Sequence, residues 1–429
     1  MDCLKATLTM RKVLNTVLIL CSLCSSLTYA HGDWDSISTF RIPERKIQFP
    51  NTEDFLIIVA DLHTHSVFSD GHVWPNIRVE EALRDGLDLI AVTEHLEYQP
   101  HQIDIPHPDR NRSFHVAKKS ASNKNLMVIN GSEITRDLPT GHINAIFIND
   151  ANKLMRMDRS KIVEAEKRVM ESSVTISDDE EKQVFVNYAL TNMLPIEEVL
   201  KKARDQDAFV FLNHPMRGSS EEPDKIARLT ELQQNIINHG YVHGIEIVNG
   251  DWFSEEAFQI AIENQLTLIG TSDIHELIDW NYQPHLGGHR PVTLILSKDR
   301  TEDSIKESLF QGRTVVWYKD YLFGLEENLE PLIKSSLKII PHSYKEDTKV
   351  IGIEIENASS AGFLIENSSD FTFHNLGNLF YIEASSKKYI EIKTIEKLEN
   401  INFSFKVLNA FFSPNETIEI DYNFSPEKN

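Results

Sequence analysis

Short apolar segments alternate with helix-like segments between about residues 55 and 324. The chief apolar segments have the length and composition of buried strands, and they are residues 55–60, 87–93, 126–130, 208–212, 244–248 and 266–270. Amphipathic segments such as residues 77–85 and 195–206 fall between them. A parallel pair of strands needs a long connection, usually a helix, so this alternation predicts mainly parallel pairing. We therefore expect an α/β sheet or barrel.

Residues of the types that bind metals follow several of these predicted strands directly. They are His63 and His65 after the first strand, then His95, Glu133 and His214, and finally Asp273 with His275. In a parallel barrel the carboxyl ends of the strands meet at one mouth, where side chains distant in sequence come together. Each of the two pairs has a spacing of two, which puts both side chains on one face of an extended chain. An isolated His-x-His pair would mean little, but its recurrence at strand ends predicts a metal site.

Two further candidate ligands have less regular positions. Asp70 lies in the loop after His65. His142 precedes an apolar segment, residues 143–148, instead of following one. Either this segment is antiparallel to its neighbours, or Gly141 lets the loop carry His142 back to the mouth.

The candidate ligands offer nitrogen and oxygen but no sulfur. All three cysteines, Cys3, Cys21 and Cys24, lie within the first 30 residues. Imidazole and carboxylate ligands suit zinc, manganese or iron(II). Nine ligands exceed the roughly three to five that one ion needs, so we expect two or three divalent ions. Closely spaced ions can hold a bridging hydroxide and clamp the oxygens of a phosphoryl group, and the sequence identifies no other catalytic residue.

At this point the nine residues resemble the ligand pattern of the PHP (polymerase and histidinol phosphatase) superfamily. That pattern is an H-x-H after the first strand, a His or Asp in the next loop, then His, Glu, His and His, and a final D-x-H. The chain supplies every member in order within about residues 55–320. The resemblance implies a distorted seven-stranded (βα) barrel with a trinuclear centre. It also implies hydrolysis of phosphomonoesters, such as histidinol phosphate or nucleotides, or of phosphodiesters.

The resemblance further assigns ligands and a substrate contact. His63, His65, Glu133 and Asp273 would hold one ion, Glu133, His142 and His214 a second, and Asp70, His95 and His275 a third. Similar chains carry HRP after the final D-x-H, here residues 289–291, so Arg290 is the candidate for gripping a substrate phosphate. The alternative is an ion pair between Arg290 and one of the many carboxylates. Arg217 and Trp280 are weaker candidates for substrate contact, the alternatives being a surface salt bridge and plain packing.

The N-terminal 30 residues have the composition of a secretory signal peptide. Lys5, Arg11 and Lys12 precede an apolar segment, residues 13–27, and Thr28 and Ala30 place small residues at the two positions that a signal peptidase reads. The alternative is a retained membrane anchor, although the segment is short for a span. A cleaved signal predicts export to the periplasm or the extracellular space, with no membrane span left in the mature chain.

The rest of the chain divides into three predicted parts. Residues 31–54 are a lead-in, and residues 55–334 are the barrel. Residues 151–194 interrupt the strand–helix rhythm, carry one predicted helix at 161–171, and form an insertion that is either a lid or a decoration. From residue 335 to 429, short alternating runs separated by Asn, Ser and Gly predict a small all-β sandwich.

Net charge narrows the range of partners. A formal charge of −22 leaves no basic face of the kind that binds nucleic acid. The leading hypothesis is therefore a metal-dependent phosphoesterase that acts on a small-molecule phosphomonoester, possibly a nucleotide or sugar phosphate. One alternative is a phosphodiesterase or an amidohydrolase-like enzyme that cleaves a C–N or C–O bond with the same centre. Another is a non-catalytic envelope protein that binds metal and glycan.

Overall fold

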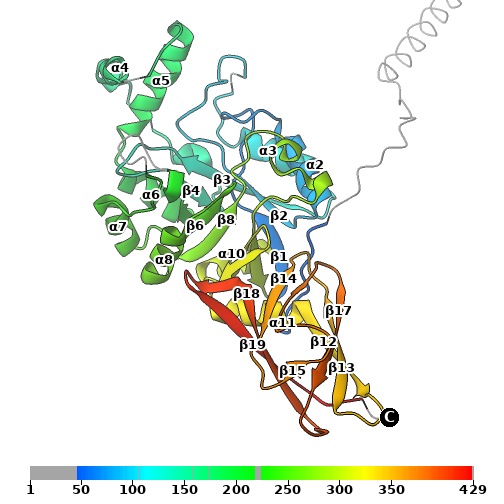
Figure 1. Ribbon diagram of the computed structural model, residues 1–429. Helices are drawn as coiled ribbons and strands as arrows, with labels where there is room; N and C mark the ends of the chain where they lie inside the picture. Colours follow the sequence, from blue (N-terminus) through cyan, green and yellow to red (C-terminus); the bar gives the residue numbers. More distant parts are fainter. Residues whose placement is uncertain (1–45, 106, 157, 173, 218–223, 428–429) are drawn as a thin grey trace, which may run out of the picture. The chain divides into compact units, whose positions relative to one another are not determined.

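A computed structural model describes residues 46–427 except residues 106, 157, 173 and 218–223 (Figure 1). The predicted signal peptide and most of the predicted lead-in lie outside the described residues. No helix in the described part of the chain combines the length and apolar character that a bilayer span requires.

Strands and helices alternate in the first part of the fold, as the sequence predicts. Parallel ladders join β1 (Leu56–Asp61), β2 (Leu89–Val92) and β3 (Met127–Ile134), and likewise β5 (Phe209–Leu212), β6 (Gly244–Asn249) and β8 (Thr267–Thr271). The helices between them are α2 (Pro75–Asp85), α3 (Arg112–Ser120), α7 (Glu231–Asn238) and α8 (Glu255–Asn264). Each parallel step thus has a helical connection long enough to return the chain to the same edge.

Antiparallel pairing is more frequent than the sequence predicts. It involves β4 (Ile143–Ile146), β9 (Val292–Ser297), β10 (Thr314–Tyr318) and β11 (Tyr321–Gly324). Strand β4 is antiparallel to both β3 and β5, which is the first of the two alternatives for His142. The short connection at residues 135–142 contains no helix, so the chain turns back beside β3 and brings His142 to the carboxyl ends of β3 and β5.

The strands of this region enclose one buried apolar cluster. Side chains from β1, β2, β3, β4, β5, β8 and β9 all contribute to it. Among the described strands, β8 faces β9 and β10 through threonine side chains instead of a backbone ladder. Thr293 Oγ1 lies 3.0 Å from Gly270 N and 2.9 Å from Gly270 O, and Thr314 Oγ1 donates to Leu268 O at 2.9 Å. A Cβ at Gly270 would collide with the Val316 side chain, so glycine permits this close approach.

The C-terminal strands form two layers. One is a separate sheet of β12 (Leu337–Tyr344), β13 (Val350–Asn357), β17 (Lys387–Lys393) and β15 (Thr372–Phe373). The other contains β16 (Leu379–Ile382), β14 (Phe363–Asn367), β18 (Ile401–Ser413) and β19 (Glu416–Phe424). Strand β18 pairs in parallel with β11, so this second layer continues the main sheet, which has 15 strands in all.

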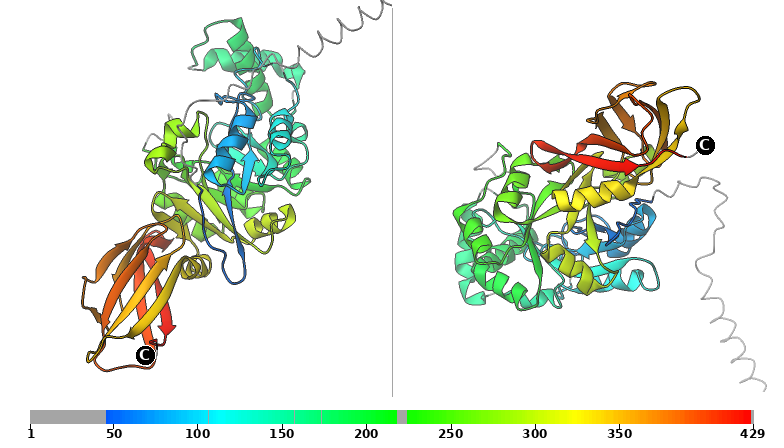
Figure 2. Two further views of the ribbon diagram at one scale, coloured as in Figure 1. Left: turned by 90° about the vertical axis from the view of Figure 1, so that its right-hand side faces the viewer. Right: turned by 90° about the horizontal axis from the view of Figure 1, so that it is seen from below.

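One hydrophobic core runs through both the strand–helix region and the C-terminal strands. It includes Val292 and Trp317 of the first and Ile353, Phe363 and Phe405 of the second. Helix α11 (Glu326–Ser336), yellow in Figure 2, contacts β10 and β11 as well as β12, β18 and β19. The helix therefore packs against both regions.

The insertion contains two helices where the sequence predicts one. Helix α4 (Ile162–Glu171) matches the predicted helix, and α5 (Asp179–Asn192) packs against it around Ala165, Val169, Val186 and Leu190. The apolar face of α5 is short, and its first turn is wholly acidic. The cue that could have predicted α5 is Asp178, whose side chain caps the helix by accepting bonds from Glu180 N and Glu181 N.

Short elements complete the fold. They are α6 (Ile196–Arg204), α9 (Ile278–Tyr282), α10 (Glu302–Phe310), β7 (Trp252–Phe253) and the 3-10 turns at Ala151–Lys153, Arg159–Lys161, Pro215–Arg217 and Pro284–Leu286. Helix α7 begins at Glu231. Thr230 and Gln233 form a capping box that fixes this start, because each side chain bonds the other residue's backbone N–H.

The shared core predicts that the two regions unfold together. Leu332 on α11 is fully buried, so Leu332→Ala should lower the free energy of unfolding by about 3 kcal/mol. The matched control is Glu330→Ala on the exposed face of α11, where loss of the ion pair with Lys334 should cost at most about 0.5 kcal/mol. Calorimetry should show one transition that moves as a whole. Two transitions, of which Leu332→Ala shifts just one, would contradict a common core.

Candidate metal centre

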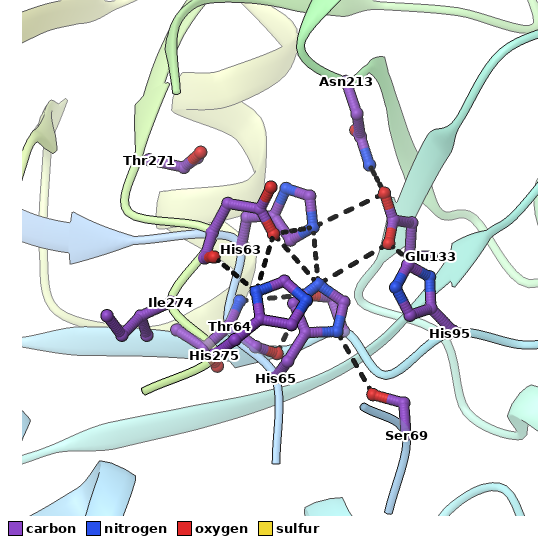
Figure 3. Close-up of polar contacts among 12 residues, drawn as sticks. His63, Thr64, His65, Ser69, His95, Glu133, Asn213, Thr271, Ile274 and His275 are labelled. Carbon is purple, nitrogen blue, oxygen red and sulfur yellow. Dashed lines mark hydrogen bonds and ion pairs between the residues drawn. The ribbon is translucent and has the colours of Figure 1, made fainter. Parts of the chain in front are cut away.

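All nine predicted ligands come together in the structure. Figure 3 shows five of them, His63, His65, His95, Glu133 and His275. Three groups have ligand atoms within 4.8 Å of one another: His65, Asp70, His95 and His275; His63, His65 and Asp273; and His95, Glu133 and His142. The ninth residue, His214, places its Nε2 3.3 Å from Glu133 Oε1. Residues from six separate segments therefore share one site, and five of these segments follow a predicted strand, that of His142 being the exception.

Backbone pairing holds the ligand-bearing segments side by side. His65 N donates to Ile274 O at 3.1 Å, and Asp273 N donates to His63 O at 3.0 Å. A second parallel bridge joins His95 and Glu133. Two ligands, His214 and Asp273, have positive φ angles of 28° and 48°. Residues other than glycine rarely adopt this backbone conformation, and backbone strain of this kind is concentrated at functional sites.

Unpaired carboxylate oxygens identify what the centre is built to hold. Asp70 Oδ1, Glu133 Oε2 and Asp273 Oδ1 are buried and have no hydrogen bond. Asp273 Oδ1 lies 3.2 Å from His63 Nε2 and 3.1 Å from His65 Nε2. Asp70 Oδ1 lies 3.1 Å from His275 Nε2. A buried anionic oxygen without a donor is costly, and a divalent cation among these nitrogen and oxygen atoms would remove that cost. The residues therefore fit a metal centre.

Charge coupling within the centre shifts the pKa values of its members. Burial alone would lower the pKa of His63, but Asp273, Glu246 and Glu133 outweigh it and raise the pKa well above its usual value. The pKa values of His95 and His275 are also raised against burial, by Glu133 and Asp70 respectively. Burial, together with His275 and His95, lowers the pKa of His65 to about 3.

The carboxylates respond in the opposite direction. Burial would raise the pKa values of Asp70, Glu133 and Asp273, but the surrounding imidazoles lower all three. The centre thus keeps its carboxylates charged, and some of its imidazoles hold protons in the absence of a cation.

Two buried glutamates that the sequence did not single out support the ligands. Glu246 Oε1 lies 2.8 Å from His63 Nδ1, and its Oε2 accepts a 2.7 Å bond from His214 N. This contact leaves His63 Nε2 facing the centre, and metal-binding histidines are commonly oriented by a carboxylate on their other ring nitrogen in this way. Glu94 accepts bonds from Ser66 N and from the hydroxyls of Ser66, Ser69 and Ser113. The sequence feature that could have identified these two residues is an acidic residue within a predicted buried strand, as Glu246 is, or directly after one, as Glu94 is.

Arg78 on α2 ties together the two segments that carry histidine pairs. Its guanidinium donates to His65 O at 2.8 Å, to His275 O at 2.7 Å and to Glu276 O at 2.5 Å. A 2.8 Å ion pair with Glu81 balances its charge, and Arg78 is 2% exposed. The sequence cue was an arginine on the inner face of an amphipathic helix.

Arg290 does not have the position that the sequence predicts. It is 1% exposed and pairs with Asp61 at 3.2 Å and with Asp85 at 2.8 Å. Asp61 in turn accepts bonds from Ser272 N and Oγ, directly before Asp273. The guanidinium is thus enclosed by carboxylates and out of reach of an incoming phosphate. The structure thus shows the alternative that the sequence leaves open, an ion pair between Arg290 and carboxylates. Through Asp61 this pair supports the segment that begins at Ser272.

Arg217, unlike the buried Arg290, lies on the solvent-exposed side of the centre. It lies in the turn Pro215–Arg217 after His214, is 40% exposed, and places Nη2 2.5 Å from Asp273 Oδ2. A cavity of about 290 Å³ is lined by His142, His214, Arg217, Arg228 and Asp137, among others. Trp280 is 65% exposed, so its side chain is not a core residue.

A solved structure from Bacteroides vulgatus aligns with nearly the whole chain. That protein is described as a two-domain protein containing a predicted PHP-like metal-dependent phosphoesterase. The alignment covers 89% of this chain and 99% of that chain, with 30% sequence identity and a TM-score of 0.73. The chain belongs to the PHP-like family. The nine residues in the sequence resemble the PHP ligand pattern, and this alignment confirms the relation to PHP-like proteins.

Other comparisons add detail. A family of Ig-like domains matches residues 337–423, which span the C-terminal strands from β12 to β19. A metal-dependent phosphoesterase structure from Bifidobacterium adolescentis, described as putative, is 18% identical and covers 55% of this chain and 89% of that chain, with a TM-score of 0.34. An amidohydrolase from Chromobacterium violaceum is 15% identical and covers 51% and 87%, with a TM-score of 0.35. These two TM-scores are too low to support an inference about this chain. None of the curated proteins matches it.

The raised histidine pKa values predict that metal binding releases protons. Imidazoles that hold a proton near neutral pH must lose it to bind a cation, so affinity should increase as the pH rises through these pKa values. Calorimetric titration with Mn²⁺ at about pH 6 and about pH 8, in buffers of different ionisation enthalpy, measures both effects. We expect tighter binding at the higher pH and a buffer-dependent heat. Equal affinity at both pH values, with a heat independent of the buffer, would show that these imidazoles are not protonated ligands.

Proposed function

We propose that this protein is a metal-dependent phosphoesterase that hydrolyses a small-molecule phosphomonoester. The observation that carries the proposal is the set of three unpaired, buried carboxylate oxygens among six imidazoles. Membership of the PHP-like family supports it. We also propose export from the cytoplasm, supported by the basic and apolar N-terminal segment in the sequence.

The ligands would hold two or three divalent ions of zinc, manganese or iron. His63, His65, Glu133 and Asp273 would share one ion, Glu133, His142 and His214 a second, and Asp70, His95 and His275 a third. The geometric groups support this division, although His65 also lies within reach of the Asp70 group and His95 within reach of Glu133. When bound, such ions supply a water of lowered pKa and neutralise negative charge on the phosphoryl group.

The protein's own residues would orient the substrate. Arg217 and Arg228 line the cavity that contains His142 and His214, at the open side of the centre. They pair with Asp273 at 2.5 Å and with Asp224 at 2.7 Å, so a substrate phosphate would compete with these carboxylates for the two guanidinium groups. A guanidinium matches the oxygens of a phosphate in a two-pronged contact. The dianion of a phosphomonoester complements these charges better than a neutral amide does, which favours phosphoester over C–N hydrolysis.

Phosphate release from a panel of phosphomonoesters tests the proposal. The wild-type protein, loaded with Mn²⁺ or Zn²⁺, should release inorganic phosphate. Asp273→Asn and His63→Ala should each lower kcat/KM by at least about a thousandfold and reduce bound metal, since each removes a ligand of a shared centre.

The control is His239→Ala at an exposed position on the C-terminal side of α7, which should leave turnover and metal content unchanged. Full turnover in Asp273→Asn and His63→Ala would contradict the assignment of the centre. Cleavage of amides without any phosphate release by the metal-loaded wild type would favour the amidohydrolase-like alternative.

A further inference from the structure

A second cavity lies beside the metal centre, against the insertion. It has a volume of about 410 Å³ and is lined chiefly by Tyr98, Val169, Phe185 and Tyr188, with Thr135 and Asp137 at its polar edge. Val169 belongs to α4, and Phe185 and Tyr188 belong to α5, which form the helical pair seen in Figure 1. The insertion therefore supplies most of the apolar wall, and the segment after β2 supplies Tyr98.

This cavity is connected to the centre through shared residues. Thr135 Oγ1 lies 2.7 Å from Nδ1 of the ligand His95. The ring of Tyr98 lies 6.1 Å from the ring of His95, centroid to centroid. Asp137 lines both this cavity and the smaller one that contains His142 and Arg217. One small molecule could place a phosphate at the centre and its organic part in the second cavity.

The walls of the cavity are aromatic. The Tyr98 ring is 6.1 Å from Phe185 at an angle of 34°, and 6.2 Å from Tyr188 at 83°. Tyr98, Phe185 and Tyr188 are each only partly buried, so each has ring surface that can contact another flat group. Ligand pockets of several hundred Å³ are commonly apolar with a few polar groups, as here.

Charge at the cavity edge disfavours a second anionic group on the ligand. Asp137 stands where the two cavities meet, and Tyr188 donates a 3.3 Å hydrogen bond to its Oδ1. Arg168, the cation that lines this cavity in the described part of the chain, already pairs with Glu164 at 2.9 Å. The lining thus suits an uncharged group.

We propose that the cavity formed by Tyr98, Phe185 and Tyr188 binds an uncharged aromatic group on the organic part of the substrate. The insertion is then a specificity element, and the substrate is a phosphomonoester whose alcohol carries an aromatic ring. This inference rests on the proposed phosphomonoesterase activity for its substrate class.

Two phosphomonoesters with nearly equal leaving groups test the cavity. 3-Phenylpropyl phosphate and propyl phosphate differ by a ring remote from the phosphate, so leaving-group acidity does not separate them. The wild-type protein should hydrolyse the phenylpropyl ester with at least a tenfold higher kcat/KM. Phe185→Ala and Phe185→Leu should each reduce this preference at least fivefold by lowering kcat/KM on the phenylpropyl ester. Thermal unfolding followed by circular dichroism shows whether the variants fold.

The matched control is Val163→Ala on α4, where Val163 is 73% exposed and lies outside the cavity lining. It should keep the full preference. An equal rate on both esters in the wild type would overturn the proposal. A parallel loss on both esters in the Phe185 variants would also overturn it, since the residue would then have a structural role.

Binding of phosphonates separates this inference from the proposed reaction. Calorimetry with 3-phenylpropylphosphonate and propylphosphonate on the metal-loaded protein requires no turnover. A tenfold tighter affinity for the ring-bearing compound that Phe185→Ala abolishes supports the cavity, even if no ester is hydrolysed. Equal or undetectable affinity for both compounds overturns it, even if the phosphomonoesterase activity is found.

Discussion

The mutual burial of carboxylates and imidazoles is the constraint on which the rest of this structure depends. Asp70, Glu133 and Asp273 each bury an oxygen whose close neighbour is an imidazole nitrogen, at 2.7 to 3.1 Å, and which has no other polar partner that the structure shows as a hydrogen bond. Such an arrangement is unfavourable in a protein interior without a compensating cation. The surrounding fold must therefore hold these buried groups at fixed positions around the centre.

Three buried charge networks provide that restraint. Arg78 binds the carbonyls of both histidine-pair segments, and Glu246 fixes His63 and the backbone of His214. Arg290, between Asp61 and Asp85, braces Ser272 and so the start of the D-x-H segment. Each network joins residues from different strands or helices, and together they fix three of the six segments, those that carry His63 and His65, His214, and Asp273 with His275. Removing one partner of such a pair leaves a buried charge unbalanced.

Much of the site could be predicted from position in the sequence, because residues that directly follow parallel strands meet at the same end of the sheet. His63, His65, His95, Glu133, His214, Asp273 and His275 follow apolar strands, and parallel strands end at a common mouth. Asp70 and His142 depended on the family pattern, and the antiparallel course of β4 explains why His142 precedes its strand. The strand–helix alternation likewise predicted the first part of the fold, but the hydrophobic pattern alone did not reveal strand direction.

What the sequence did not predict depends on contacts between distant residues. The motif around Arg290 identifies a conspicuous arginine but carries no information on its burial, which Asp61 and Asp85 determine from 229 and 205 residues away. The supporting roles of Glu246 and Arg78 likewise arise from distant backbone groups. The link between the C-terminal strands and the main sheet arises from the pairing of β11 with β18, for which neither strand's own pattern provides a cue.

Anomalous diffraction from crystals of the protein grown with Mn²⁺ would test the role of the unpaired oxygens most directly. We expect anomalous peaks within coordination distance of Asp70 Oδ1, Glu133 Oε2 and Asp273 Oδ1, at about 2.0–2.3 Å. A well-ordered centre in which these three oxygens contact only protein groups or water, with no anomalous signal, would contradict the conclusion that the site is built around metal ions.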